Sequence, residues 1–202
     1  MPKMPYVFVI ALVACLLAVL TIGCQATRAG YESAAYKVVR SEGRFQVRDY
    51  PTLTVVETPS SPAADGSDGS FNRLFQFISG RNAHRQKIPM TTPVFMTGSG
   101  TNSTMAFVMP AKMMANDVPA PANDRVQVRQ IEGGRFAVLR YSGGRGAERK
   151  GGNLAELRAW MQEQKLAESG SPIRAYFDPP WIPGFLRRNE VMLRVANAPG
   201  TP

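Results

Sequence analysis

Cysteine and histidine are scarce in this 202-residue chain, which has two cysteines and one histidine. Both cysteines, Cys15 and Cys24, lie near the N-terminus, so the later sequence cannot form a disulfide framework. The single histidine, His84, excludes a multi-histidine metal site, and it has no later cysteine to activate as a nucleophile. G-x-S-x-G and phosphate-binding-loop motifs are also absent. We therefore expect a binding protein rather than an enzyme.

Charge is almost absent from the N-terminal segment, where Lys3 is the only charged side chain before Arg28. The apolar run from Tyr6 to Ile22 is at the short limit for a spanning helix of ~20 residues, and it is typical of a signal peptide. Ile22-Gly23-Cys24 fits the end of a bacterial lipoprotein signal, in which the cysteine is acylated. A simple secretory signal with an incidental cysteine is the alternative.

This interpretation divides the chain into four parts: a signal peptide (1–23), a tether (24–30), one folded domain (31–196) and a short tail (197–202). A domain of that length can bury a sufficient core without disulfide bonds. We expect an exported protein of the bacterial envelope, anchored to the membrane through acylated Cys24 and facing the periplasm.

Basic residues outnumber acidic ones, giving a formal net charge of +9, and 18 of the 24 basic residues are arginines. Arginine binds carboxylates and lipid headgroups bidentately, so one interpretation is anion recognition. The other is codon bias, with the arginines spread over solvated faces, and their scatter from Arg28 to Arg194 favours it. Because of the export signal we do not expect nucleic acid as a partner.

Two stretches of the chain follow one plan and predict an α+β fold. In the first, strands at 44–58 precede a helix at 70–79 and the segment 87–96. In the second, strands at 126–141 precede a helix at 153–164 and the segment 176–195. We expect two pseudo-repeated halves that form a curved, mostly antiparallel sheet or a distorted β-barrel with two flanking helices. The seam between them is the natural place for a ligand.

Local sequence patterns predict where the first helix starts and ends, which face of a strand is buried, and where prolines restrict the chain. Ser70 is expected to cap the first helix and Gly80 to end it. In the first strand, Phe45 and Val47 alternate with Arg48 and its polar neighbours, which predicts one buried and one wetter face. The prolines of 87–96 predict an edge or bulged strand. Those near Trp181 predict a rigid loop, which either walls a pocket or fixes Trp181 in the core.

Four segments, in this order along the chain, match the sequence motifs of one family. They contain Phe45, Val47, Arg48 and Tyr50; Phe71, Leu74, Phe75, Phe77, Ile78, Gly80 and Asn82; Lys87, Ile88, Met90, Thr91, Pro93 and Val94; and Pro180, Trp181, Pro183, Arg188, Asn189, Glu190 and Val191. This pattern, over roughly 31–195, resembles the SOUL family of haem-binding proteins. The resemblance implies that haem or a related porphyrin binds, without catalysis, in an apolar cleft beside the first helix.

Position relative to that helix suggests which residues would form the cleft. Aromatic and aliphatic side chains would supply its walls, namely Phe71, Phe75, Ile78, Met90 and Val94. Nearby cations would pair with the porphyrin propionates, namely Arg73, Arg81 and Lys87.

The sequence does not determine which residue would bind haem iron as an axial ligand. His84 is a candidate ligand, but the charged residues around it favour an exposed loop position. Some relatives carry a histidine where this chain has Asp49. Methionines such as Met90 and Met105 could offer a thioether to haem iron or copper, although methionine more often fills gaps in a core.

Two further interpretations remain beside the haem carrier. The architecture also resembles bacterial effector-binding domains, which take amphipathic cations around a buried acid, and Glu190 would be that acid. Alternatively, the protein is a lipoprotein that binds a protein or envelope partner. For Arg188 and Glu190 a structural network at a strand start is the simpler interpretation.

Overall fold

The computed structural model describes residues 30–60, 68–98, 102–144 and 147–196, together with Tyr6, 8–13 and Cys15 of the N-terminal segment. The side chains of 147–150 lie outside the description. Cys24, the predicted lipidation site, also lies outside the described residues. Among the described residues, no helix has both the length and the apolar character needed to cross a bilayer.

Nine strands in the described part of the chain form one sheet with the order β2-β3-β9-β11-β10-β6-β7-β4-β8. They are β2 (Lys37–Glu42), β3 (Phe45–Tyr50), β4 (Leu53–Ser60), β6 (Val94–Thr97), β7 (Ser103–Val108), β8 (Gln127–Ile131), β9 (Gly134–Tyr141), β10 (Glu168–Tyr176) and β11 (Asn189–Val195). All neighbours pair antiparallel. The short strands β1 (Glu32–Ser33) and β5 (Thr91–Thr92) pair parallel in a separate ladder.

The sheet curls but does not close, because β2 and β8 form its two ends. The predicted antiparallel sheet is therefore confirmed, and the alternative of a distorted barrel is wrong. Repetition of two similar halves stays a prediction. The edge position predicted for the proline-containing segment is confirmed for β5, which has β1 as its single neighbour in the described two-stranded ladder. It fails for β6, which starts directly after Pro93 and lies in the middle of the sheet between β10 and β7.

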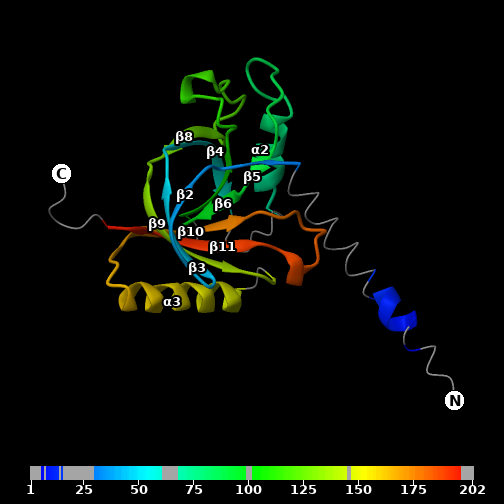
Figure 1. Ribbon diagram of the computed structural model, residues 1–202. Helices are drawn as coiled ribbons and strands as arrows, with labels where there is room; N and C mark the ends of the chain where they lie inside the picture. The colour runs from blue at the N-terminus through cyan, green and yellow to red at the C-terminus, as the bar shows by residue number, and fades with distance from the viewer. Residues whose placement is uncertain are drawn as a thin grey trace.

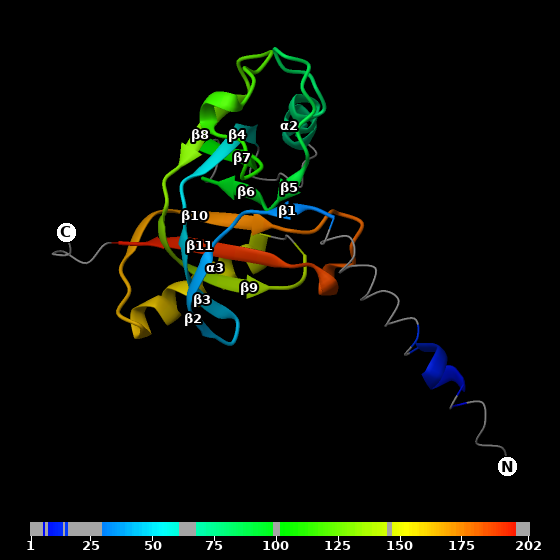
Figure 2. The same ribbon diagram turned by 45° about the horizontal axis from the view of Figure 1, so that its top comes forward.

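Two helices cover the outer face of the curled sheet from opposite sides of the molecule (Figure 1). The longer one, α3 (Ala147–Glu163), packs Leu157, Trp160 and Met161 onto β3, β9 and β11. The shorter, α2 (Ser70–Ile78), packs Leu74 and Phe77 onto β4 and β7. Figure 2 shows the same separation of the helices after rotation.

The α2 helix begins differently from the prediction. Gly69, with φ of +76°, is its N-cap, and Ser70 is the first helical residue. Asp68 serves the start of the helix instead, since its Oδ1 accepts the Ser70 backbone N–H at 3.0 Å. The predicted extent of the helix is otherwise confirmed within one residue at its end.

The inner face of the curled sheet carries its own apolar cluster. Alternate residues of the strands point into it, including Val55, Phe95, Val138 and Met192. Strand alternation thus gives the sheet two buried faces wherever a helix also covers the outside. This double burial explains the uninterrupted hydrophobic runs at residues 136–139 in β9 and 191–193 in β11.

Candidate functional site

A cavity of about 450 Å³ lies between α2 and the outer face of the sheet, where β6 pairs with β10. The lining comes from four parts of the chain: the entry to β1, α2, the strands β5 to β7, and the end of β10 with the loop after it. The lining residues are Tyr31, Phe71, Phe75, Met90, Thr92, Val94, Met96, Met105, Tyr176, Phe177, Asp178, Pro179, Pro180 and Trp181.

Helical spacing divides α2 into a packed stripe and a stripe that faces the cavity. Leu74 and Phe77 are buried against the sheet, whereas Phe71 and Phe75 are 41% and 47% exposed. Residues four apart lie on one face, and the rings of Phe71 and Phe75 stack at 6.1 Å between centroids. One turn of helix therefore presents two parallel aromatic rings to the cavity.

The cavity floor is formed by residues that lie opposite one another on neighbouring strands. Tyr176 of β10 lies opposite Val94 of β6, and Met96 of β6 lies opposite Met105 of β7. Directly opposed residues in antiparallel strands put their side chains on the same face, so these four side chains form one apolar surface.

The third wall is the proline-containing loop that follows Tyr176. Arg187 fastens this loop, because its Nε donates to the Ile182 carbonyl at 2.7 Å and its Nη2 donates to the Pro180 carbonyl. Trp181 is 71% exposed and lines the cavity. Of the two sequence interpretations of this loop, the pocket wall holds and the core anchor does not.

Four of the eight predicted cleft residues line the cavity, namely Phe71, Phe75, Met90 and Val94. A fifth, Ile78, is buried in the core under α2 instead. The three predicted cations are not in the described lining. Arg73 donates to Thr58 Oγ1 and to the carbonyls of Asp68 and Pro59, Arg81 donates to Gln76, and Lys87 is exposed.

His84 is exposed and is not among the described residues that line the cavity. The exposed loop position favoured from sequence is therefore confirmed. Asp49 stands at the position where some relatives carry a histidine, and its carboxylate is paired with another residue. It forms an ion pair with Arg135 at 2.8 Å, and this hydrogen bond lowers the pKa of its carboxyl group.

Asp178 is the one acidic side chain in the described lining, which contains no lysine or arginine. It is 4% exposed, and its Oδ2 accepts the backbone N–H of Arg188 at 2.5 Å. The described walls are thus aromatic, aliphatic and thioether groups with a single carboxylate.

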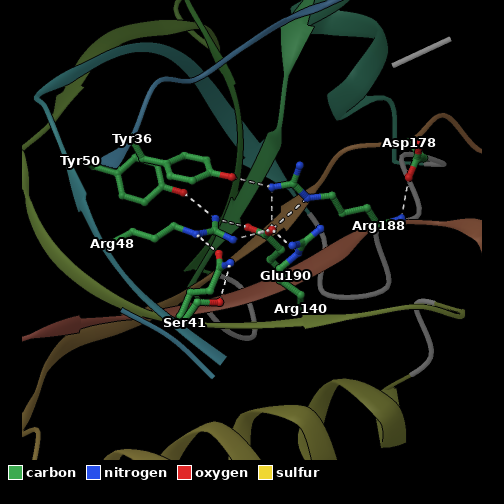
Figure 3. Close-up of polar contacts among 9 residues, drawn as sticks. Tyr36, Ser41, Arg48, Tyr50, Arg140, Asp178, Arg188 and Glu190 are labelled. Atoms are coloured by element: carbon green, nitrogen blue, oxygen red, sulfur yellow. Dashed lines mark hydrogen bonds and ion pairs between the residues drawn. The ribbon is translucent and has the colours of Figure 1, made fainter. Parts of the chain in front are cut away.

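A second polar centre, which we call the charged cluster, lies on the inner face of the same sheet. It consists of Arg48, Arg188, Glu190, Tyr50 and Tyr36, and Figure 3 shows the side chains converging on Glu190. Arg48 and Glu190 are both 0% exposed and form two hydrogen bonds, of 2.7 and 2.9 Å. Arg188 adds bonds of 2.8 and 2.9 Å to the same carboxylate.

Both tyrosines complete this cluster. Arg48 donates to the Tyr50 hydroxyl at 3.0 Å and lies 4.2 Å from the Tyr36 ring centroid, and Arg188 donates to the Tyr36 hydroxyl at 3.1 Å. Burial opposes the charge on Arg48, but the hydrogen bond and charge of Glu190 outweigh it and raise the pKa of the guanidinium. Burial also raises the pKa of Tyr50 to about 12.

The charged cluster and the cavity are adjacent but separate. Glu190 is paired with Ala175 and faces inward, whereas the next residue along β10, Tyr176, faces the cavity. Phe177 contacts both regions: it lines the cavity, and the Arg188 guanidinium lies 3.7 Å from its ring centroid. Glu190 is therefore not a cavity acid, and Asp178 occupies that position.

Sequence reasoning offered the loop around Trp181 as a pocket wall in one of two interpretations, but it did not place Tyr176, Asp178 or Tyr31 in the site. The signal for the loop was present in its three prolines. No comparable local signal marks Tyr31, since its place in the lining depends on the pairing of β1 with β5.

Comparison with known proteins identifies one family. The family model described as SOUL heme-binding protein matches residues 31–194. No curated protein sequence matches the chain. Among solved structures, the C-terminal domain of EcmrR superposes with a TM-score of 0.55 at 14% identity, covering 76% of this chain and 98% of that one.

Two further structures share the fold. A protein described as a hydrolase from Listeria innocua gives a TM-score of 0.55 at 10% identity and covers 78% of this chain and 94% of its own. EcmrR in a complex with DNA gives 0.57 at 13% identity and covers 77% and 59%. At such low identities the likeness establishes the fold alone.

Proposed function

Because this chain belongs to the SOUL haem-binding family, we propose that it is a non-enzymatic binder of haem or a related porphyrin, acting as a carrier, buffer or scavenger. The observation that carries the proposal is the cavity of about 450 Å³ under α2. Its volume falls within the ~300–1,000 Å³ of small-molecule sites, and apolar walls with few polar groups are typical of them.

The cavity opens to the surface, since its lining residues Phe71, Phe75 and Trp181 are 41%, 47% and 71% exposed. Its apolar walls therefore face water when no ligand is bound, and displacing that water favours a flat hydrophobic ring.

The donor groups in the lining suit a porphyrin held mainly by its ring. The described lining has no imidazole for iron, and its soft donors are the thioethers of Met90, Met96 and Met105. It also has no basic side chain for the propionates. We infer that contacts with Phe71, Phe75 and the methionines supply most of the affinity, with iron coordination secondary.

The proposal places the protein in the bacterial envelope. The apolar run of 6–22 and the Ile22-Gly23-Cys24 sequence support export and acylation at Cys24. A mass increase equal to a diacylglyceryl group, lost in Cys24→Ser, would verify the anchor.

Porphyrin titration of the purified full-length chain in mild detergent tests the ligand. Hemin is followed by its Soret shift and metal-free protoporphyrin by its fluorescence. We expect both to saturate, with affinities within about tenfold, i.e. ~1.4 kcal/mol, and we expect His84→Ala to bind as the unsubstituted chain does. Binding of hemin alone would contradict the secondary role of iron, and binding of neither would refute the function.

An amphipathic organic cation is a second candidate ligand, and Asp178 is the observation that favours it. Asp178 places a carboxylate that is 4% exposed among the apolar groups of the described lining, and a negative charge there would favour a cationic ligand over a neutral one. Glu190, the acid considered from sequence, is instead bound by Arg48 and Arg188. Displacement of bound porphyrin by a lipophilic cation, but not by a neutral analogue of the same shape, would support this candidate.

A further inference from the structure

Large aromatic side chains surround the mouth of the cavity. Trp181 is 71% exposed, and Phe71 and Phe75 are 41% and 47% exposed. All three also line the cavity, so its apolar interior continues onto the surface at this place. Exposed apolar groups that gather in one patch, rather than occurring singly, mark an interaction surface.

The folded part of the described chain begins at residue 30, next to the cavity. Tyr31 lines the same cavity as Trp181, and β1 directly after it is held by β5 and by the bond from the Ala34 N–H to the Thr92 carbonyl at 2.8 Å. Figure 1 and Figure 2 both show this entry next to the loop between β10 and β11.

The length of the preceding sequence limits how far the mouth can lie from a bilayer. Cys24 is seven residues before Tyr31, and the apolar run ends at Ile22. Seven residues reach at most ~25 Å when fully extended. An anchor at this point, whether acylated cysteine or apolar segment, therefore keeps the mouth within that distance of the membrane surface.

The segment that follows α2 carries charge of the sign that anionic lipid headgroups attract. Arg81, Arg85 and Lys87 are all exposed in the segment after the helix end at Ile78. Arg81 donates to Gln76 in the last turn of α2, so its guanidinium lies at the C-terminal end of the helix that carries Phe71 and Phe75. Basic side chains next to exposed aromatic rings are the combination found where proteins lie on anionic bilayers.

We propose that the cavity mouth docks on an anionic lipid bilayer, with Trp181, Phe71 and Phe75 entering the interface, so that a hydrophobic ligand exchanges directly between bilayer and cavity. Tryptophan favours this depth because its ring is apolar and its N–H remains hydrated. The inference concerns the orientation of the domain, and it holds whichever hydrophobic molecule the cavity takes.

Tryptophan quenching by brominated lipid tests the docking without any ligand. The full-length chain is reconstituted into anionic vesicles whose acyl chains carry bromine, and its fluorescence is compared with that of Trp181→Phe. The chain has two tryptophans, and Trp160, on α3, is 5% exposed where it packs against the sheet, so the difference between the two proteins reports on Trp181. We expect the Trp181 component to be quenched by bromine and shielded from aqueous iodide, and the Trp160 component to be unchanged.

A charge-reversed variant and a surface control complete the test. In Arg81→Glu/Lys87→Glu we expect loss of the Trp181 quenching. Val38→Ser/Val39→Ser, on the exposed edge strand β2, should leave it unchanged. A Trp181 component that remains open to iodide and insensitive to bromine in the unsubstituted chain would overturn the proposal. Because no porphyrin is present, that result would leave the proposed function standing.

Discussion

The cavity and the charged cluster lie on opposite faces of the same stretch of sheet, and they are filled in opposite ways. In the cluster, Glu190 receives four hydrogen bonds from Arg48 and Arg188 with neither Arg48 nor Glu190 exposed. In the cavity, side chains leave about 450 Å³ open, and the one described charge is Asp178. The arginines of the cluster are paired within the fold, whereas the described cavity lining is mainly apolar.

This contrast between the charged cluster and the cavity also explains how a chain with an excess of basic residues can have a described cavity lining without lysine or arginine. Burying Arg48 and Glu190 costs several kcal/mol per ion, and only close pairing with further hydrogen bonds offsets it. Arg188 and both tyrosines provide those bonds. Arg188 is consequently committed to the cluster through its guanidinium, and only its backbone N–H and its contact with Phe177 reach the cavity side.

Removing the cluster acid should give the largest effect. In Glu190→Gln, Arg48 stays buried without its counter-charge, and we expect a loss of about 3–5 kcal/mol in the free energy of unfolding. Denaturant unfolding followed by circular dichroism measures it. The matched control is Glu57→Gln, whose partner Arg129 is 60% exposed, and it should cost ~1 kcal/mol or less. Equal losses in the two variants would show that burial of the pair has no special weight.

Raising the pH should give the next largest effect, because it should destabilise the charged cluster. Because burial raises the pKa of Tyr50 to about 12, the folded state holds the phenol proton more tightly than the unfolded chain does. This difference in the pKa of Tyr50 contributes on the order of 2 kcal/mol to the free energy of unfolding. The contribution is complete below the unfolded pKa of ~10 and is lost as pH rises toward ~12. Unfolding across this range should therefore show a fall in stability that Tyr50→Phe lacks. A fall of the same size in Tyr50→Phe would assign the effect to other groups.

The fold was largely predictable because its signals are local. Helical spacing of Leu74 and Ile78, and of Leu157 and Met161, predicted both helices, although α3 begins at Ala147 and not at residue 153. Strand alternation predicted the antiparallel sheet. Closure of the sheet was not predictable, since it depends on whether β2 and β8 meet and no local pattern encodes that.

The site was half predictable for a similar reason. Phe71, Phe75, Met90 and Val94 lie near one another in sequence, so position beside α2 sufficed to find them. Arg48 was expected on the wetter face of β3, but it is 0% exposed because Glu190, 142 residues later, neutralises it inside. Long-range pairing of this kind reverses what alternation alone predicts.

Truncating an aromatic residue on α2 should distinguish the stripe that binds from the stripe that stabilises. Phe75→Ala removes a cavity wall that is 47% exposed, so we expect porphyrin affinity to fall about tenfold, ~1.4 kcal/mol, with less than ~1 kcal/mol lost in stability. Phe77→Ala, two residues away and 2% exposed, should instead cost about 3–5 kcal/mol in stability. Titration and denaturant unfolding of both variants check this. Unchanged porphyrin affinity in Phe75→Ala would place the ligand elsewhere.

Removing the negative charge of Asp178 should give the smallest change in ligand affinity, and the change should depend on the charge of the ligand. Asp178→Asn keeps an oxygen that can accept the Arg188 N–H, so the loop should stay in place while the negative charge is removed. We expect binding of a porphyrin with ionised propionates to strengthen about threefold and binding of a lipophilic cation to weaken about threefold, each ~0.6 kcal/mol. Asp49→Asn, a surface acid paired with Arg135, should change neither. Competition titrations with both ligand types measure the two shifts. Opposite signs require that Asp178 acts through its charge at the ligand, whereas shifts of the same sign would mean that the substitution alters the shape of the wall between Phe177 and Trp181.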